Sequence, residues 1–208
     1  MDSYDIFSDF EGTIAVPEIS YKEWVKKKRA SPEVGRKMDE EYEKRMNRVR
    51  SERSTESWTG YLKMYSNLLS AEDFKQMALE YSLNPVFLWW CKKFYGLHGV
   101  KDGKQKGLNV TVVTRGFAPV ARLFFQREDV RKSLENMNIA ASKVVGSEPL
   151  LNNKRERFGM VKGLQSVVYA KRKYVREGHI MLGDDGEEKE FANYGQFVNL
   201  SKRKKIEE

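Results

Sequence analysis

The sequence predicts an α/β protein whose core is a doubly wound, Rossmann-like parallel sheet, with an all-helical cap inserted after the first strand. One observation is that short β-prone runs alternate with helical patterns from residue 109 onward. Another is that residues 20–96 carry continuous helical signals and no comparable strand. A third is that one isolated β-prone run precedes this helical stretch. The helical stretch therefore interrupts a core that begins before it and continues after it.

The first strand is expected within residues 4–10, a β-prone run that leads into a loop at Gly12 and Thr13. Helix starts follow at Ser31, which precedes a proline, and at Ser70, which is closely followed by two acidic residues. From these boundaries we expect the catalytic core to consist of residues 1–16 and 106–208. The cap is expected to consist of residues 17–105.

The later strands of the core follow the same alternation. Residues 109–114 are rich in β-branched side chains, which is typical of a parallel strand covered on both faces. A helix is expected to begin at Pro119, and another to span residues 162–174. Further strands are expected at residues 139–145, 179–182 and 197–198.

The composition is that of a folded globular protein, since 40% of the 208 residues are hydrophobic and 12% are aromatic. No apolar run approaches the roughly 18 residues of a membrane span, and the start of the chain has no basic segment followed by an apolar one. We therefore expect a cytoplasmic protein without a membrane partner. Its single cysteine, Cys91, excludes an intrachain disulfide and is expected to be a buried structural thiol.

The formal charge of +8 raises the alternative of a nucleic-acid or membrane-surface partner. The basic residues, however, are mostly interleaved with acidic residues or gathered at the end of the chain, which is typical of solvated faces and argues against nucleic acid. The basic runs lie at residues 26–29, 154–157, 171–173 and 201–205.

Reactive side chains follow three of the expected strands. Asp9 follows the first strand, Thr114 ends the second, and Asp184 with Asp185 follows the strand at residues 179–182. The carboxyl ends of parallel strands meet at one edge of an open sheet, where ligands bind, so these residues should converge. Carboxylate oxygens from two loops form a hard site that suits Mg²⁺.

This constellation predicts phosphoryl transfer through a covalent intermediate. A carboxylate such as Asp9 can attack a phosphate dianion only if cations and hydrogen-bond donors neutralise the repulsion, as Mg²⁺, Lys162 and backbone amides of the loop would. The attack forms an aspartyl-phosphate, which splits one difficult displacement into two easier ones. Glu11, two residues further on, is placed to act as general acid and base, and Gly12 allows a tight phosphate-binding turn.

Taken singly, each of these residues has a structural alternative. The segment around Asp9 could be an ordinary acidic turn, and Thr114 could be a strand-end residue. Lys162 alone would be a helix-surface lysine. The run at residues 183–186 could be a turn or a fragment of a calcium loop, although the ligand spacing of a calcium-binding EF-hand is absent. Their order at successive strand ends favours the catalytic interpretation.

These motifs resemble those of the haloacid dehalogenase-like hydrolase superfamily, and specifically its phosphoserine phosphatase branch. The resemblance covers nearly the whole chain. It rests on residues 9–13 as the nucleophile motif, 112–117 as the phosphate-binding motif, Lys162 and Gly163 as the lysine motif, and 183–188 as the metal motif. The helical insert between the first two motifs matches the position of the cap in this branch.

The resemblance implies a role for each site residue. Asp9 would be nucleophile and metal ligand, and Glu11 the general acid and base. The implied Mg²⁺ ligands are Asp9, the backbone carbonyl of Glu11, and Asp184, with Asp185 and Glu188 in supporting positions. Thr114 and Lys162 would hold the transferring phosphoryl group, and the implied substrate-binding residues are Gly12, Glu18, Arg115 and Gly116.

Three positions of the predicted site either depart from the family pattern or have more than one interpretation. Glu18 lies where phosphoserine phosphatases carry a glutamate that meets the substrate's amino group, but it could equally be a solvated hinge residue. Glu11 replaces the usual aspartate, and the same replacement, followed by a similar segment at residues 16–19, occurs in a subgroup resembling phosphoserine and homoserine phosphotransferases. Arg115 stands where the branch often has a small residue, and could read a substrate anion, narrow the pocket or point away.

The expected function is Mg²⁺-dependent hydrolysis of a small phosphorylated metabolite, with phosphoserine as the first candidate and transfer to an alcohol acceptor as a variant. Dehalogenation is disfavoured, because Glu11 and the metal motif serve phosphoryl chemistry. The non-enzymatic alternative is a basic nucleic-acid-binding or scaffold protein on a phosphatase fold. The sequence leaves open whether the protein is a monomer or a homodimer.

Overall fold

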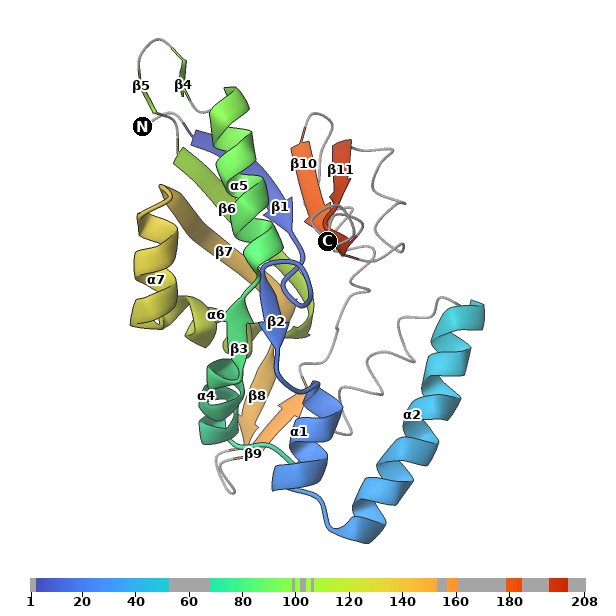
Figure 1. Cartoon of the computed structure of the whole chain (residues 1–208). Helices are drawn as coiled ribbons and strands as arrows, with labels where there is room; N and C mark the ends of the chain where they lie inside the picture. The colour runs from blue at the N-terminus through green and yellow to red at the C-terminus, as the bar shows by residue number, and fades with distance from the viewer. Residues whose placement is uncertain are drawn as a thin grey trace.

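The computed structural model describes residues 3–52, 68–98, 100–101, 104–105, 107–152, 157–160, 179–184 and 195–201. Within them the chain forms a five-stranded sheet in the order β11-β10-β1-β6-β7, with every neighbouring pair parallel (Figure 1). The strands are β1 (Ser3–Ser8), β6 (Gly107–Phe117), β7 (Ile139–Ser147), β10 (His179–Gly183) and β11 (Gly195–Asn199).

The first strand lies in the middle of the sheet, and the strand order reverses around it. Ile6 pairs with Val110 of β6 on one side and with Ile180 of β10 on the other. Such a reversal is a topological switch point, and ligands of open α/β sheets bind outside the carboxyl ends of the strands there. The register sets Ser8 beside Val112 and Leu182, so Asp9, Thr114 and Asp184, which lie one or two residues further along, share one edge of the sheet.

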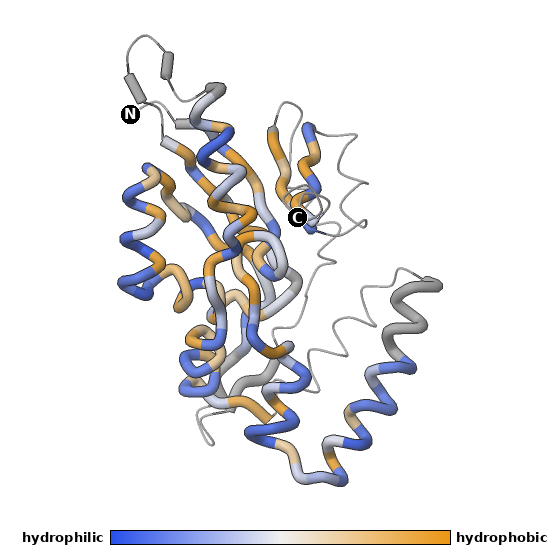
Figure 2. Tube along the Cα trace, in the orientation of Figure 1, coloured by the Kyte–Doolittle hydropathy of each residue, from blue (hydrophilic) through white to orange (hydrophobic). Residues whose placement is uncertain are grey.

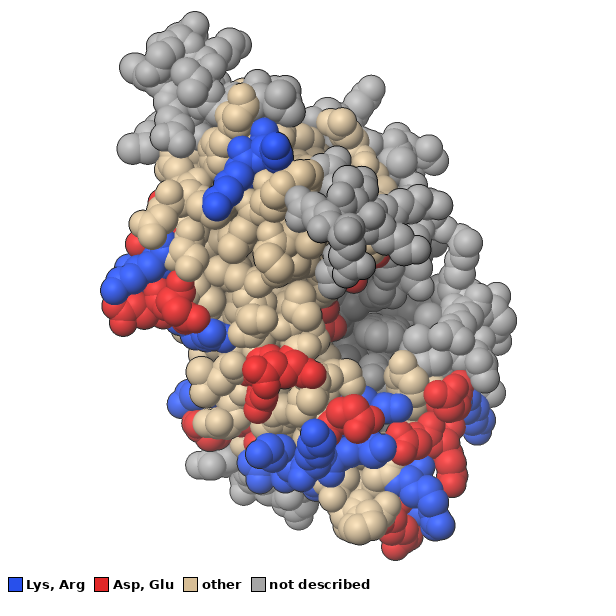
Figure 3. Space-filling model, viewed as in Figure 1, with Lys and Arg blue, Asp and Glu red and all other residues tan. Residues whose placement is uncertain are grey.

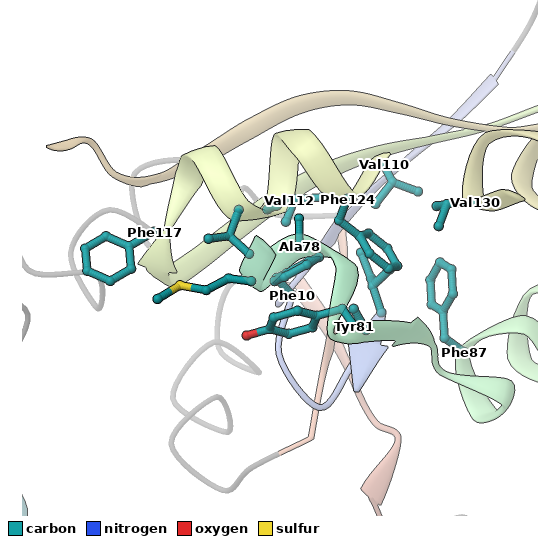
Figure 4. Close-up of a cluster of buried hydrophobic side chains, with 14 of the residues drawn as sticks. Phe10, Ala78, Tyr81, Phe87, Val110, Val112, Phe117, Phe124 and Val130 are labelled. Carbon is teal, nitrogen blue, oxygen red and sulfur yellow. The ribbon is translucent and has the colours of Figure 1, made fainter. Parts of the chain in front are cut away.

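One face of the sheet is covered by α5 (Pro85–His98), α6 (Ala118–Gln126) and α7 (Glu128–Glu135) (Figure 1). The strands and the inward sides of these helices carry most of the apolar residues (Figure 2). Figure 4 shows the resulting core, in which Phe10 contacts Phe124 edge to face at 5.4 Å between ring centroids. The opposite face has a smaller buried cluster of Phe7, Val113 and Met181.

The insert between β1 and β6 contains α1 (Tyr21–Lys28), α2 (Pro32–Glu52) and α4 (Ala71–Leu79). It also contains two short strands, since β2 (Ala15–Pro17) pairs antiparallel with β3 (Tyr81–Leu83). The expected helical run is therefore interrupted by one three-residue strand. The remaining strands are two hairpins, β4 (Val100–Lys101) with β5 (Lys104–Gln105) and β8 (Pro149–Asn152) with β9 (Arg157–Met160).

The helices of the insert are held by two kinds of contact, an aromatic contact at α4 and ion pairs between α1 and α2. Phe74 of α4 meets Phe117 at the start of α6, with ring centroids 5.1 Å apart. Lys22 and Lys26 of α1 both pair with Asp39 of α2, and basic and acidic side chains intermingle over these two helices (Figure 3). This part of the basic run at residues 26–29 is balanced by acidic partners.

The structure confirms the predicted fold class and the five predicted strands, which correspond to β1, β6, β7, β10 and β11; β1 ends at Ser8, before the end of the predicted run at residues 4–10. The helix expected at residues 162–174 lies outside the described residues. In the insert, α5 packs on the sheet through a contact between Phe94 and Tyr4, and the division between core and cap remains a prediction. Cys91 is buried and unpaired as a thiol, and burial raises its pKa. Among the described helices, none is long and apolar enough to cross a membrane.

Candidate active site

Asp9 lies at the carboxyl end of β1, in the position that the switch-point argument predicts for a reactive residue. It is 7% exposed. Its backbone N–H donates to the carbonyl of Leu182 in β10, at 3.0 Å, and its own carbonyl accepts from the Ser8 hydroxyl at 2.8 Å. The start of the loop is thereby tied to the neighbouring strand.

Asp184, the first residue after β10, lies directly against this loop. Gly12 has a φ of +74°, and a Cβ on it would come within 1.9 Å of Asp184 Oδ2, so only glycine permits this approach. The Thr13 hydroxyl lies 3.4 Å from Asp184 Oδ1, which it reaches as a donor. The structure thus brings the loops after β1 and β10 together, as the sequence predicts.

The loop after Asp9 is held by a dense set of hydrogen bonds. The N–H groups of Ile14 and Ala15 both donate to the carbonyl of Phe10, at 3.0 and 2.9 Å. Asn84 Nδ2 donates to the carbonyl of Gly12 at 2.7 Å, while the Asn84 N–H donates to the carbonyl of Ile14 at 2.8 Å. The geometry of the loop is therefore fixed from the insert side as well.

Asn84 is a site residue that sequence reasoning missed. Its side chain is buried, and Oδ1 accepts from the N–H of Val86 at 3.0 Å, which caps the start of α5. An asparagine before a proline and an apolar helical run is a recognisable helix start, and could have identified the cap. Nothing in the sequence pattern indicates that the same side chain also holds Gly12.

Thr114 lies in β6, one strand away from Asp9, and is 2% exposed. Its Oγ1 accepts from the N–H of Gly116 at 3.0 Å, so its own hydroxyl proton remains to be donated. Neighbouring glycines make room for this arrangement, since a Cβ on Gly146 would lie 2.7 Å from Thr114 Cγ2. A Cβ on Gly116 would lie 2.8 Å from the Oη of Tyr21, so the α1 tyrosine packs over this turn.

Glu11 meets two tyrosines of the insert. The Tyr81 hydroxyl donates to Glu11 Oε1 in a very short hydrogen bond. Burial, followed by the nearby Tyr21 and the charge of Glu11, raises the pKa of Tyr81 well above its usual value. Burial and then the charge of Glu11 raise the pKa of Tyr21 in the same way, and its hydroxyl is buried without a hydrogen-bond partner among the described residues. Both hydroxyls therefore keep their protons at neutral pH.

Of the other predicted site residues, the structure describes Glu18 and the backbone of Arg115. Glu18 has an exposed side chain between β2 and α1, and its N–H donates to the carbonyl of Glu80 at 2.9 Å. The backbone of Arg115 belongs to β6, but its side chain lies outside the described part of the structure, as do Lys162, Asp185 and Glu188 entirely.

The donor set at the sheet edge fits a hard divalent cation. Asp9 and Asp184 offer carboxylate oxygens at the ends of two neighbouring strands. Because Gly12 has no side chain, Asp184 can lie against the loop that contains the Glu11 carbonyl. Within the described ranges no group of three His, Cys, Asp or Glu side chains occurs that could hold a metal. The ligand set that the resemblance implies combines two carboxylates with a backbone carbonyl.

Solved structures share this fold. A phosphoserine phosphohydrolase-like protein from Francisella tularensis subsp. tularensis SCHU S4 superposes with a TM-score of 0.56 at 14% identity, over 94% of this chain and 86% of that one. A phosphoserine phosphatase, described as a phospho-aspartyl intermediate analogue, superposes with a TM-score of 0.53 at 13% identity, over 98% of this chain and 91% of that one.

A HAD family hydrolase from Salmonella enterica subsp. enterica serovar Typhi also superposes with a TM-score of 0.53, at 10% identity, over 90% of this chain and 58% of that one. The sequence matches no protein-family model and no curated protein. At these identities the likeness establishes a common architecture. The chain therefore shares the fold of these proteins, as the resemblance of its motifs predicts.

Proposed function

We propose that the protein is a Mg²⁺-dependent phosphatase that acts on a small phosphomonoester through an aspartyl-phosphate at Asp9. The observation that carries this proposal is the close approach of Asp184 to Gly12, in the loop that begins with the buried Asp9. That approach brings the loop after β10 against the loop after β1 at the switch point of the sheet, which supports a shared metal site there. Mg²⁺, when bound there, would neutralise phosphate charge that otherwise repels the nucleophile.

In the first half-reaction, a carboxylate oxygen of Asp9 forms a bond to phosphorus while the bond to the leaving oxygen breaks. Glu11 gives its proton to that oxygen, so the product leaves as an alcohol. The hydroxyl of Thr114 donates to a phosphoryl oxygen, and Lys162 pairs with another. These contacts hold the group in line for transfer.

In the second half-reaction, Glu11 takes a proton from water as the water oxygen attacks phosphorus, and the Asp9–phosphorus bond breaks to release inorganic phosphate. An alcohol in place of water would give phosphotransfer by the same steps. The solved phosphoserine phosphatase with this fold represents an analogue of a phospho-aspartyl intermediate, and such an intermediate is the species proposed for this chain.

The proposed substrate is a phosphoserine-like metabolite. One solved structure with this fold is a phosphoserine phosphatase, and another is a phosphoserine phosphohydrolase-like protein. The segment at residues 16–19 supports the same class of substrate, because it resembles a segment of the phosphoserine and homoserine phosphotransferase-like subgroup. In this proposal Glu18 meets the substrate's amino group, while Gly12, Arg115 and Gly116 line the phosphate side. Asp185 and Glu188 support the metal ligands.

The test is a screen of phosphorylated metabolites with and without Mg²⁺, comparing the wild type with Asp9→Asn. We expect Mg²⁺-dependent release of phosphate from small monoesters and a loss of at least about 10³-fold in Asp9→Asn, because the amide cannot form the intermediate. Asp5→Asn is the matched control, because Asp5 is an exposed residue of β1, the strand that Asp9 follows, and accepts a surface hydrogen bond from Asn109 at 2.7 Å. Full activity in Asp9→Asn, or Mg²⁺-independent turnover, would contradict the proposal. A salt-dependent gel shift without phosphatase activity would favour the nucleic-acid-binding alternative.

A further inference from the structure

The hydrogen bond from Tyr81 to Glu11 joins the insert to the loop that carries the nucleophile. Tyr81 belongs to β3, where it pairs with Pro17 of β2, and its carbonyl accepts from Arg127 Nη1 at 2.6 Å. Its ring packs against Phe10, with centroids 5.2 Å apart. In Figure 4 the hydroxyl of Tyr81 points away from the apolar cluster that holds the ring.

This setting makes Tyr81 a rigid donor. The ring is 3% exposed and is contacted from the β1 loop and α6, so its hydroxyl has little freedom to move. Its hydroxyl is directed at the Glu11 carboxylate, to which it donates a hydrogen bond.

Glu11 is the residue that needs such a donor. A glutamate has one more rotatable bond than an aspartate, and fixing that bond costs conformational entropy. Displacement of a reacting group by about 1 Å can lower a rate by on the order of 10²-fold. A donor that fixes Oε1 removes this freedom and determines which oxygen carries the working proton.

We propose that Tyr81 is a positioning residue that adapts the longer side chain of Glu11 to its role as general acid and base. With Oε1 accepting from Tyr81, the proton delivered to the leaving oxygen travels from Oε2, and the proton taken from water returns to Oε2. This inference rests on the proposed function and adds to it a reason why a glutamate can serve at this position. It also makes the insert a part of the catalytic machinery, because Tyr81 reaches Glu11 from β3.

The test is a double-mutant cycle of Tyr81→Phe and Glu11→Asp, measured with two substrates that differ in their leaving group. An alkyl phosphate such as phosphoserine needs protonation of its leaving oxygen, whereas p-nitrophenyl phosphate does not. We expect Tyr81→Phe to lower kcat for the alkyl phosphate about 10-fold, with KM little changed and p-nitrophenyl phosphate affected by less than about 3-fold. In the Glu11→Asp background the same substitution should cost less than about 2-fold, because the shorter carboxyl no longer reaches the hydroxyl.

Tyr95→Phe is the matched control. Its hydroxyl also donates one hydrogen bond, to the carbonyl of Asn138 at 2.7 Å, but at the opposite edge of the sheet. We expect its kcat to equal that of the wild type with both substrates. If Tyr81→Phe does not fold, Glu11→Asp alone tests the inference from the other end of the bond: it should lower kcat for the alkyl phosphate, although it restores the residue usual in the family it resembles.

The failures of the two claims are distinguishable. A wild type without Mg²⁺-dependent phosphatase activity refutes the proposed function itself. An active wild type in which Tyr81→Phe slows both substrates equally, or slows them equally in both backgrounds, refutes only the positioning role of Tyr81. A Glu11→Asp variant that is faster than the wild type with the alkyl phosphate would refute it as well.

Discussion

Gly12 shows how a single position without a side chain assembles the candidate site. Its positive φ costs a non-glycine residue about 1–2 kcal/mol, and a Cβ would overlap the Asp184 carboxylate. We therefore expect Gly12→Ala to lower Mg²⁺-dependent activity by at least about 10²-fold and the free energy of unfolding by at least about 1 kcal/mol. Steady-state assays and urea denaturation measure the two effects.

Gly96 is the control for that substitution. A Cβ on it would meet nothing within 4 Å, and it lies in α5, where alanine is the better helix former. Gly96→Ala should leave activity unchanged and raise the free energy of unfolding by about 0.5–1 kcal/mol. Equal effects of the two substitutions would contradict the view that Gly12 is required by Asp184.

Among the site residues, the sequence predicted that Asp9, Thr114 and Asp184 lie at the carboxyl ends of strands, because each directly follows or ends a β-prone run. It could not predict that Tyr81 binds Glu11, because the two residues are 70 positions apart and meet only through the pairing of β2 with β3. Asn84 was missed for the same reason. Contacts that depend on an intervening fold leave no local pattern.

Among the elements, the junction of α1 and α4 depends on one buried carboxylate. Asp73 is 2% exposed; its Oδ2 accepts from the N–H and hydroxyl of Ser70, at 2.7 and 2.8 Å, and its Oδ1 accepts from Arg29 Nε at 2.8 Å. Asp73→Ala removes a helix cap and leaves Arg29 without this partner. We expect the free energy of unfolding to fall by about 2–3 kcal/mol in urea denaturation.

Glu72→Ala serves as the control, since Glu72 precedes Asp73 but has an exposed side chain that pairs with Lys75 at 3.0 Å. An exposed pair contributes little, so the change should stay within about 0.5 kcal/mol. If Asp73→Ala lowered the free energy of unfolding no more than the control does, the junction of α1 and α4 would not depend on this carboxylate.

Some helices and strands were predicted from the sequence and others were missed, for physical reasons. The strand β6 was found because it carries a run of β-branched residues, which strongly favours an extended backbone. The three-residue β3 was missed because so short a strand is specified by its partner β2 and not by its own residues. The helix α7 was missed because its charged surface gives it few apolar residues, of which Val130 and Leu134 are buried.

For the whole molecule, buried hydroxyls and a buried thiol predict alkaline unfolding. The pKa values of Tyr21 and Tyr81 are raised, that of Tyr95 is raised to about 12, and that of Cys91 is also raised, in each case chiefly by burial. A group with a raised folded pKa holds its proton longer in the folded state, so stability is lost as the pH passes its unfolded value. Each fully buried tyrosine should cost about 1.4 kcal/mol per pH unit above about pH 10.

Urea denaturation at a series of pH values from neutral to strongly alkaline measures this loss, with tyrosinate absorbance as the second signal. Stability should begin to decline at about pH 9, where the thiol of Cys91 ionises in the unfolded chain, and should decline more steeply above about pH 10. Tyr21→Phe with Tyr81→Phe should reduce the steeper part of the slope. Titration of all tyrosines near pH 10 in the folded protein would contradict the burial of these two hydroxyls.

The architecture of the whole molecule followed from the order of its patterns, because alternating strands and helices permit few topologies. The chemistry followed only in part, since the roles of Asp9, Glu11 and Asp184 come from the resemblance and not from the strand pattern. The central claim is that Asp9 becomes phosphorylated. The most direct measurement is mass spectrometry of the protein quenched in acid during turnover of a phosphomonoester with Mg²⁺. The account predicts a phosphoryl group on the peptide that contains Asp9, absent from Asp9→Asn; turnover with the phosphoryl group on another residue, or with none, would contradict it.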